Sequence, residues 1–203
     1  MIRVVDYGLG NVQAFLTTFQ RLGVAADRAR SIEDLRDASK VILPGVGAFD
    51  HAMELLEASG MAPALHELAI EQQIPILGIC VGMQILADRS EEGVLPGLGL
   101  VPGSVRAFSS HPNTRGLPKP HMGWNDVQPT TSCPLFRQID SPRFYFLHSY
   151  YFDCAQPDDV AGTTTYGFPF QSAVQRGNVY GVQFHPEKSH HWGVGLLSNF
   201  ARL

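Results

Sequence analysis

The first half of the chain alternates short, β-branched runs with helical patterns, and no other feature limits the possible folds as much. Residues 2–5, 40–43 and 76–79 read as strands, and segments with helical spacing of their apolar residues lie between them. Strands that alternate with helices are typical of a parallel sheet covered by helices on both faces. The sequence therefore predicts a layered α/β fold for this half.

Helix signals in this half agree with that fold. The longer helical patterns cover residues 12–22, 50–59 and 62–72. Gly23 is suited to end the first of them, because glycine readily adopts the left-handed conformation that closes many helices. Ser31 is expected to cap a further short helix, with Glu33 and Asp34 in its first turn near the positive end of the helix dipole.

Extended runs punctuated by Gly, Pro and Asn replace this alternation in the second half. They cover residues 101–108, 144–151, 160–166 and 173–175, and a last core strand and a closing helix are expected at residues 179–184 and 195–200. Such runs indicate a largely antiparallel β region added to a mostly parallel central sheet. Because no repeat, low-complexity tract or linker interrupts the chain, we expect residues 1–203 to form a single domain.

The composition excludes several classes of function. The chain has 203 residues, 44% of them apolar, a formal charge of −4 and three widely spaced lysines, so a nucleic-acid partner is not expected. No run approaches the roughly 20 apolar residues that cross a bilayer, and the N-terminus lacks a signal-peptide pattern, so we expect a cytoplasmic protein that does not span a membrane. The three cysteines include no Cys-x-x-Cys pair, which argues against a disulfide framework, and no metal or cofactor is expected.

One of the cysteines, Cys80, lies where an apolar strand meets a helix in the segment PILGICVGMQIL. Gly78 and Gly82 flank it in the arrangement Gly-x-nucleophile-x-Gly, a sharp turn that side chains at the glycine positions would obstruct. Such a turn presents the sulfur at the C-terminal edge of the sheet, where the N-terminus of the next helix favours thiolate over thiol. The alternative is a buried, inert cysteine, which is how we interpret Cys133 and Cys154.

A base for this nucleophile, and a group to orient the base, are present in the segment VYGVQFHPEKS. His185 ends an apolar strand and Glu187 follows two residues later, a spacing that places both side chains on one face of an extended segment. Pro186 favours that conformation, so the carboxylate is expected to orient the imidazole. The alternative is a His-Pro-Glu turn at the surface. Because parallel strands end at a common edge, Cys80 and His185 are expected to meet there.

Two backbone N–H groups are the usual means of stabilising the oxyanion that forms when sulfur attacks a carbonyl carbon. One should be the amide of Val81, directly after the nucleophile. We expect the other in the segment PGVGAF, which follows a strand, and favour the amide of Val46. Gly45 and Gly47 allow close approach and an unusual peptide orientation there. The alternative is a plain strand-to-helix turn, but three such parts at three strand ends favour an active site.

These segments resemble the motifs of a known family. LPGVGAF, GICVGMQ and GVQFHPEKS are similar to those of the class I, triad-type glutamine amidotransferases, whose fold is flavodoxin-like. Within that family, DYGLGN, PHMGWN and FYFLHSYY resemble the glutaminase subunit of imidazole glycerol phosphate synthase, from histidine biosynthesis. The resemblance extends over essentially the whole chain.

The resemblance implies a reaction and a set of substrate contacts. Cys80 attacks glutamine, and His185, oriented by Glu187, protonates the departing ammonia. Water then hydrolyses the γ-glutamyl thioester to glutamate. Positions that match the family's substrate contacts are Gly45, Gly47, Gln84, Glu92, Ser149 and Tyr150. Gln84 also stands one helical turn beyond Cys80 and therefore on the same face.

The resemblance also implies a partner in a heterodimer. In this family ammonia passes into a separate cyclase subunit of the HisF type, a (β/α)8 barrel, which forms imidazole glycerol phosphate and an aminoimidazole carboxamide ribonucleotide. Positions that resemble the docking face are Asn11, Trp124, Tyr145 and Lys188. Exposed aromatic residues beside a lysine suit such an interface, whereas core packing is the alternative for Trp124 and Tyr145.

Other functions remain open from the residues alone. A cysteine peptidase or other amidase on the same scaffold would use the same kind of triad. Glutaminase subunits that serve other synthases, such as those for carbamoyl phosphate, guanylate or anthranilate, share the triad as well. A catalytically silent scaffold subunit would be expected to have lost Cys80, His185 or Glu187, and all three are present.

Overall fold

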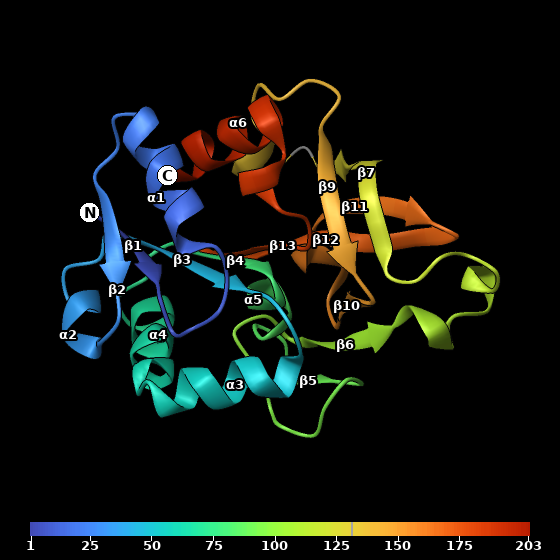
Figure 1. Ribbon diagram of the computed structural model, residues 1–203, viewed down its shortest axis with the longest axis horizontal. Coiled ribbons are helices and arrows are strands. Elements are labelled where there is room, and N and C mark those ends of the chain that lie inside the picture. Colours follow the sequence, from blue (N-terminus) through green and yellow to red (C-terminus); the bar gives the residue numbers. More distant parts are fainter. Residues whose placement is uncertain (131) are drawn as a thin grey trace.

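The computed structural model, which describes residues 1–130 and 132–203, has a mixed β-sheet of eleven strands at its centre (Figure 1). Five neighbouring strands run parallel, in the order β2 (Ala26–Ala29), β1 (Ile2–Val5), β3 (Lys40–Gly45), β4 (Ile76–Cys80) and β13 (Val179–Val182). Their carboxyl ends lie at one edge of the sheet, where α/β proteins commonly form their binding sites.

Helices cover both faces of these strands (Figure 1). On one face α1 (Val12–Arg21) contacts α6 (His190–Ala201); on the other α3 (Phe49–Ala58) contacts α4 (Met61–Ile70), which also contacts α2 (Ile32–Leu35). Each helix turns an apolar stripe toward the sheet, so that Phe19, Leu56 and Leu65 are completely buried. The predicted layered α/β architecture is confirmed.

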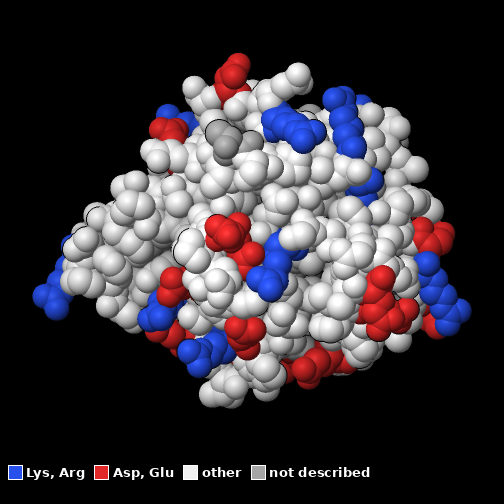
Figure 2. Space-filling model, turned by 180° about the vertical axis from the view of Figure 1, so that it is seen from behind, with Lys and Arg blue, Asp and Glu red and all other residues white. Residues whose placement is uncertain are grey.

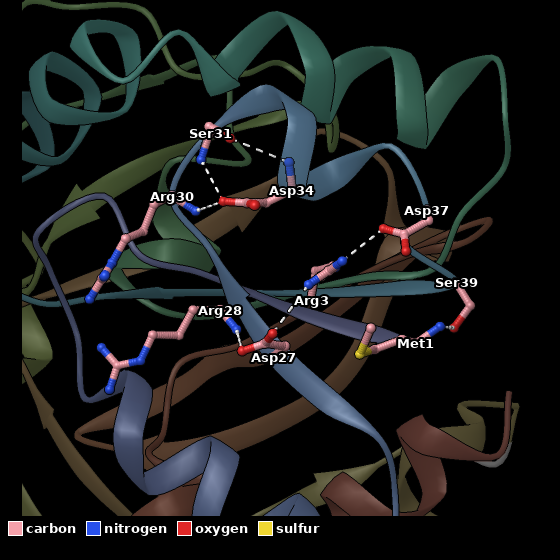
Figure 3. Close-up of polar contacts among 9 residues, drawn as sticks. All are labelled: Met1, Arg3, Asp27, Arg28, Arg30, Ser31, Asp34, Asp37 and Ser39. Atoms are coloured by element: carbon pink, nitrogen blue, oxygen red, sulfur yellow. Dashed lines mark hydrogen bonds and ion pairs between the residues drawn. The ribbon is translucent and has the colours of Figure 1, made fainter.

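Local sequence signals explain where these elements begin and end. The three strands predicted in this half are confirmed, and the three longer helices lie within two residues of their predicted bounds. Gly23, just beyond α1, has the left-handed φ of 68° that closes the helix. Before α2, Ser31 accepts a hydrogen bond from the Asp34 N–H while the Asp34 carboxylate accepts one from the Ser31 N–H (Figure 3). This reciprocal cap fixes the start of α2.

The strand β2, which the sequence did not predict, is an edge strand of only four residues with two charged side chains, so its pattern is weak. Polar contacts attach the chain around it to β1 (Figure 3). Arg3 donates to Asp37 at 2.8 Å and pairs with Asp27 at 3.6 Å, and the N-terminal ammonium donates to the Ser39 hydroxyl at 3.0 Å. Because both aspartates are exposed, these pairs add little to the stability of the fold.

The second half adds the predicted antiparallel region to the other side of the sheet. Antiparallel to β13 lies β12 (Phe168–Arg176), followed by β10 (Tyr150–Cys154), β6 (Gly103–Ala107) and β5 (Arg89–Ser90), while β11 (Val160–Tyr166) pairs with both β12 and β8 (Gln128–Pro129). A separate two-stranded sheet is formed by β7 (His121–Asp126) and β9 (Arg143–His148). The short elements between strands are α5 (Val81–Gln84) and the 3₁₀ turns η1 (Phe108–Ser110), η2 (Pro112–Thr114), η3 (Pro134–Phe136), η4 (Pro157–Asp159) and η5 (Pro186–Lys188).

One predicted strand in this half is divided in the structure. The run predicted at residues 144–151 is not one strand, because the chain passes from the small sheet to the main sheet at Ser149, between β9 and β10. The closing helix expected to contain residues 195–200 is confirmed as part of α6, which begins at His190. The strand β7 was not predicted, since only alternate side chains of its polar, glycine-containing sequence are sheltered.

The surface is mixed in charge. On the face shown in Figure 2, basic and acidic side chains are interspersed, and neither sign forms a continuous field. Such a face lacks the basic patch that binds nucleic acid. Within residues 1–130 and 132–203, no helix has the length and apolar character that crossing a membrane requires.

Candidate active site

Cys80 occupies a strained turn at the end of β4. Its φ of 56° and ψ of −114° place it in a region that residues with side chains rarely adopt, as expected for a nucleophile held out of a sheet on a sharp turn. A Cβ on Gly78 would lie 2.8 Å from the carbonyl carbon of Gly82, and one on Gly82 would lie 2.9 Å from that of Leu43. Both contacts are with backbone atoms, so the elbow can form only with glycine at these positions.

The helix after the elbow, α5, is short. It comprises only Val81–Gln84, because the N–H groups of Leu86 and Ala87 bond to carbonyls three residues back and the chain turns toward β5. One turn is nevertheless sufficient to bring Gln84 and Cys80 to the same cavity.

His185 and Glu187 form a buried pair. The ring Nδ1 lies 2.9 Å from the Glu187 Oε1, and both side chains are 4% exposed. The carboxylate can only accept, so Nδ1 carries a proton and Nε2 is left for the sulfur. Burial lowers the pKa of His185, but Cys80 and Glu187, as hydrogen-bond partners and negative charges, outweigh it and raise the pKa to about 9. The imidazole is therefore protonated at neutral pH when the sulfur is ionised.

The geometry of this pair corrects the sequence argument. We expected His185 and Glu187 on one face of an extended segment, but β13 ends at Val182 and residues 186–188 form the 3₁₀ turn η5, with His185 as its N-cap. Pro186 is the reason, because its fixed φ suits the first position of a helical turn as well as an extended chain. The turn brings the carboxylate to the ring by another route.

A cavity of about 270 Å³ opens above Cys80. Its volume is near the lower end of the range for small-molecule sites, which suits a free amino acid better than a polypeptide. Of the residues proposed from the sequence, it is lined by Val46, Gly47, Cys80, Val81, Gln84, Glu92, Ser149, Tyr150, His185 and Lys188. Apart from Glu92, which follows β5, these residues come from the end of β4, from the segments that follow β3, β4 and β13 and from the junction of β9 with β10, so the cavity lies at the expected edge of the sheet.

Other proposed residues lie behind this lining. Glu187 supports His185 from outside the cavity. Gly45 packs so closely on the elbow that a Cβ there would lie 2.9 Å from the carbonyl carbon of Val81. Gly45 therefore permits the loop that carries Val46 to approach the nucleophile. Tyr7, which the sequence analysis did not consider, holds the same loop by donating its hydroxyl to the Pro44 carbonyl at 2.9 Å.

Two proposed substrate contacts also have partners within the protein. The Gln84 amide nitrogen donates to the Gln183 side-chain oxygen at 3.0 Å and to the Tyr150 carbonyl at 3.4 Å. Glu92 accepts from the backbone N–H of Phe49, the first residue of α3, at 2.8 Å, and burial raises the pKa of its carboxyl. Each side chain thus braces the cavity wall as well as facing the cavity.

Sequence reasoning missed several residues at the site. Pro120, Leu147 and His148 line the cavity, and the buried Gln183 donates its amide to the Cys80 sulfur at 3.8 Å. Gln183 could have been found, because it follows β13 directly and stands two residues before His185. His148 lies inside the FLHSYY motif, directly before the proposed substrate contacts Ser149 and Tyr150.

Burial affects the thiols of the other two cysteines. It raises the pKa of Cys133 to about 11 and that of Cys154 to about 12, so both thiols stay protonated at neutral pH. This agrees with their interpretation as structural residues.

Aromatic side chains gather beside the cavity in what we call the aromatic cluster, defined as Trp124, Tyr145, His190 and Trp192. The Trp124 ring stacks on His190 and meets the edges of Tyr145 and Trp192, and the Lys188 ammonium lies 5.8 Å from the Tyr145 ring. Trp124 remains 38% exposed, so core packing does not describe it. Asn11 caps α1 by accepting from the Ala14 N–H, and α1 contacts η5 next to Lys188.

Comparison with known proteins agrees with this geometry. Residues 3–202 match the family described as "Glutamine amidotransferase class-I". Two solved structures share the fold at TM-scores of 0.76 and 0.72, a glutamine amidotransferase (19% identical, covering 100% of this chain and 99% of the other) and PurLQS from Thermotoga maritima (18%, covering 99% and 97%). The chain belongs to the class-I glutamine amidotransferase family.

Full-length relatives narrow the comparison within that family. A protein of Bdellovibrio bacteriovorus named "Imidazole glycerol phosphate synthase subunit HisH" is 54% identical over all of both chains. Relatives of the same name in Leptospira borgpetersenii and Leptospira interrogans are 47% and 45% identical, again over the full length of each chain.

Proposed function

We propose that this chain is the glutaminase subunit of an imidazole glycerol phosphate synthase and hydrolyses glutamine to glutamate and ammonia. The observation that carries the proposal is that Cys80 and His185 line one small cavity beside the glycine-containing loop at residues 45–47, with Glu187 paired to His185 from behind. The names of the full-length relatives supply the particular synthase. On this reading residues 1–203 act as one domain, in the cytoplasm.

The first half-reaction forms a thioester. The Cys80 sulfur, its proton held by His185, attacks the side-chain carboxamide carbon of glutamine, and the carbonyl oxygen becomes an oxyanion. The amides of Val81 and Val46 are the proposed donors to that oxygen. When the C–N bond breaks, the His185 imidazolium gives its proton to the leaving nitrogen, which departs as ammonia. A raised pKa for His185 suits this step, because the ring is then charged at neutral pH.

The second half-reaction returns the enzyme to its starting state. His185, now neutral, takes a proton from water as the water oxygen attacks the thioester carbon. The C–S bond then breaks, which releases glutamate and leaves the Cys80 sulfur beside the protonated ring. Glu187 orients the imidazole throughout without exchanging a proton. Gly45, Gly47, Gln84, Glu92, Ser149 and Tyr150 are the proposed contacts for the amino-acid end of glutamine.

We further propose that the ammonia passes to a cyclase subunit, a (β/α)8 barrel, docked over the aromatic cluster in a heterodimer. The partly exposed Trp124 and Tyr145 lie beside Lys188, and aromatic residues with a cation are typical of the centre of an interface. Lys188 lies both in the cavity wall and under this face, and so connects the two. Asn11 is the fourth proposed contact, and the contact of α1, which it caps, with η5 supports a position at the margin of the same face.

A rate comparison tests the proposed function. Purified chain is given glutamine alone, then with the cyclase subunit and its nucleotide ligand, while glutamate release is measured; casein and a dipeptide serve as control substrates. Glutamate should form slowly in the free chain and faster in the complex, within the roughly 5- to 150-fold range of allosteric couplings. Peptide cleavage would identify a peptidase instead. Equal rates with and without the cyclase would favour a different synthase.

Trp124→Ala should weaken docking of the cyclase subunit by about 2 kcal/mol, or roughly 30-fold in Kd, since buried tryptophans dominate many interfaces. Ile70→Ala is the matched control, because Ile70 is 51% exposed on α4, away from the aromatic cluster, and should leave Kd unchanged. Calorimetric titration of each variant with the cyclase measures the difference. Equal affinities for the two variants would remove Trp124 from the interface.

A further inference from the structure

Two histidines outside the triad meet in the interior behind the cavity wall. The Nδ1 of His121, on β7, lies 2.9 Å from the Nε2 of His148, on β9, and the residues are 4% and 5% exposed. Aromatic rings enclose them: Phe146 and Tyr166 stack on His121, while Phe108 and Phe170 pack against both histidines. Polar rings are held in such an apolar setting only when their nitrogens are satisfied.

The hydrogen-bond partners fix the tautomer of each ring. The Nδ1 of His148 lies 2.7 Å from the Tyr150 carbonyl, which can only accept, so this nitrogen carries the proton. The Nε2 of a neutral His148 is then bare and must accept from His121 Nδ1–H. By the same reasoning His121 Nε2 accepts from the Asn125 amide at 3.2 Å. The second hydrogen of that amide is donated to the Thr165 carbonyl at 3.0 Å.

These hydrogen bonds, which we call the relay, therefore run in one direction, from Asn125 through His121 and His148 to the Tyr150 carbonyl. The relay ends at the junction where the backbone crosses from β9 to β10, and Gln84, one turn beyond the nucleophile, donates to the same carbonyl. His148, Ser149 and Tyr150 all line the cavity. Without these donors, the Tyr150 carbonyl at the start of β10 would lose two hydrogen-bond partners.

We propose that His121 and His148 are positioning residues that hold the Ser149–Tyr150 segment in the conformation that binds the amino-acid end of glutamine. The inference rests on the proposed function, since it concerns the wall of the same cavity. It assigns a role to residues that neither the triad nor the oxyanion donors require. The relay acts on substrate affinity, because it touches neither the sulfur nor the ring of His185.

Both histidines of the relay remain uncharged at neutral pH. Burial lowers the pKa of His121 to about 4. Burial also lowers the pKa of His148 to about 3. The positive charges of His121 and His185 add to this effect, and the hydrogen bond to the Tyr150 carbonyl opposes it. The titratable groups that face the pair are His185 at the end of β13 and Tyr166 on β11; the neighbours from η1, β9 and β12 are phenylalanines. Both rings thus stay neutral while His185 changes charge.

Asparagine and glutamine at position 148 separate the two ring nitrogens. The amide of His148→Asn can occupy the place of Nδ1 and still donate to the Tyr150 carbonyl, whereas that of His148→Gln reaches the place of Nε2 and contacts His121 instead. In the complex with the cyclase, His148→Gln should raise KM for glutamine about tenfold, with kcat within about threefold of wild type, since one buried hydrogen bond is lost. His148→Asn should keep KM within about threefold.

Equal kinetic constants in the two variants, whatever their melting temperatures, would make His148 a packing residue and overturn the proposal.

The tautomers of His121 and His148 give a second readout that needs no substrate. Long-range proton–nitrogen spectra of histidine-labelled protein should show His121 and His148 neutral and protonated at Nδ1 down to about pH 5. Titration of either ring above that pH, or a proton on His148 Nε2, contradicts the relay. Absence of glutaminase activity in wild type would count against the proposed function alone, because the spectra remain decisive.

Discussion

Replacing Cys80 by alanine should abolish glutamine-dependent synthesis in the complex, by a factor on the order of 10⁴ or more, as when a covalent nucleophile is removed. The Cys80 sulfur forms the covalent bond between the enzyme and its substrate. Without it, the remaining residues can bind glutamine but cannot accept its acyl group. Synthesis from added ammonium salts should continue at the wild-type rate, because the cyclase then receives ammonia directly. Product formation under the two nitrogen sources is the measurement.

Cys154→Ala is the matched control for that experiment. It removes a thiol whose raised pKa keeps it protonated at neutral pH, so both activities should remain. If Cys80→Ala loses both activities, the residue is structural. If it loses neither, another nucleophile is at work.

Gly193→Ala should displace the catalytic residues His185 and Glu187, although Gly193 is not part of the cavity wall, whereas Gly195→Ala should not. A Cβ on Gly193 would overlap the carbonyl oxygen of Pro186 and lie 2.7 Å from its carbonyl carbon. Because Pro186 stands between His185 and Glu187, α6 can accommodate the methyl group only by displacing the turn that holds both. We expect about 1–3 kcal/mol of lost stability from this overpacking. Glutaminase activity should fall at least tenfold, as expected for an angstrom-scale misplacement of catalytic groups.

Gly195 lies in the same helix, and a Cβ there would meet only the Ile139 side chain at an ordinary 3.5 Å. Gly195→Ala should therefore leave activity unchanged and raise stability by up to about 1 kcal/mol, the difference in helix propensity. Urea unfolding and steady-state glutaminase assays compare the two variants. Similar behaviour of both would show that α6 does not position the triad.

The parallel half of the fold was predictable from sequence because its signals are local. The strand Ile76–Cys80 is a continuous apolar run, the strand Ile2–Val5 has Arg3 as its one polar residue, and capping residues such as Ser31 and Gly23 mark the helix ends. The antiparallel half was predictable only in kind. The break at Ser149 depends on which of two sheets each half of the run pairs with, and that choice is made by distant parts of the chain.

The parts of the candidate site differ in the same way. Cys80 and its flanking glycines were predictable, because the steric demands of the elbow act within five residues. That His185 and Glu187 belong together was predictable from their spacing, but the 3₁₀ turn that joins them was not, since Pro186 fits both conformations. The relay through His121 and His148 joins residues on different strands, so no short pattern could indicate it.

Alkylation by a chloroketone analogue of glutamine tests the central claim most directly, namely that Cys80 is the nucleophile activated by His185. Peptide mapping of the labelled protein should find the adduct on Cys80, free glutamine should prevent it, and His185→Ala should slow it. Adducts on Cys133 or Cys154, or labelling of Cys80 that glutamine does not protect against, would contradict the account.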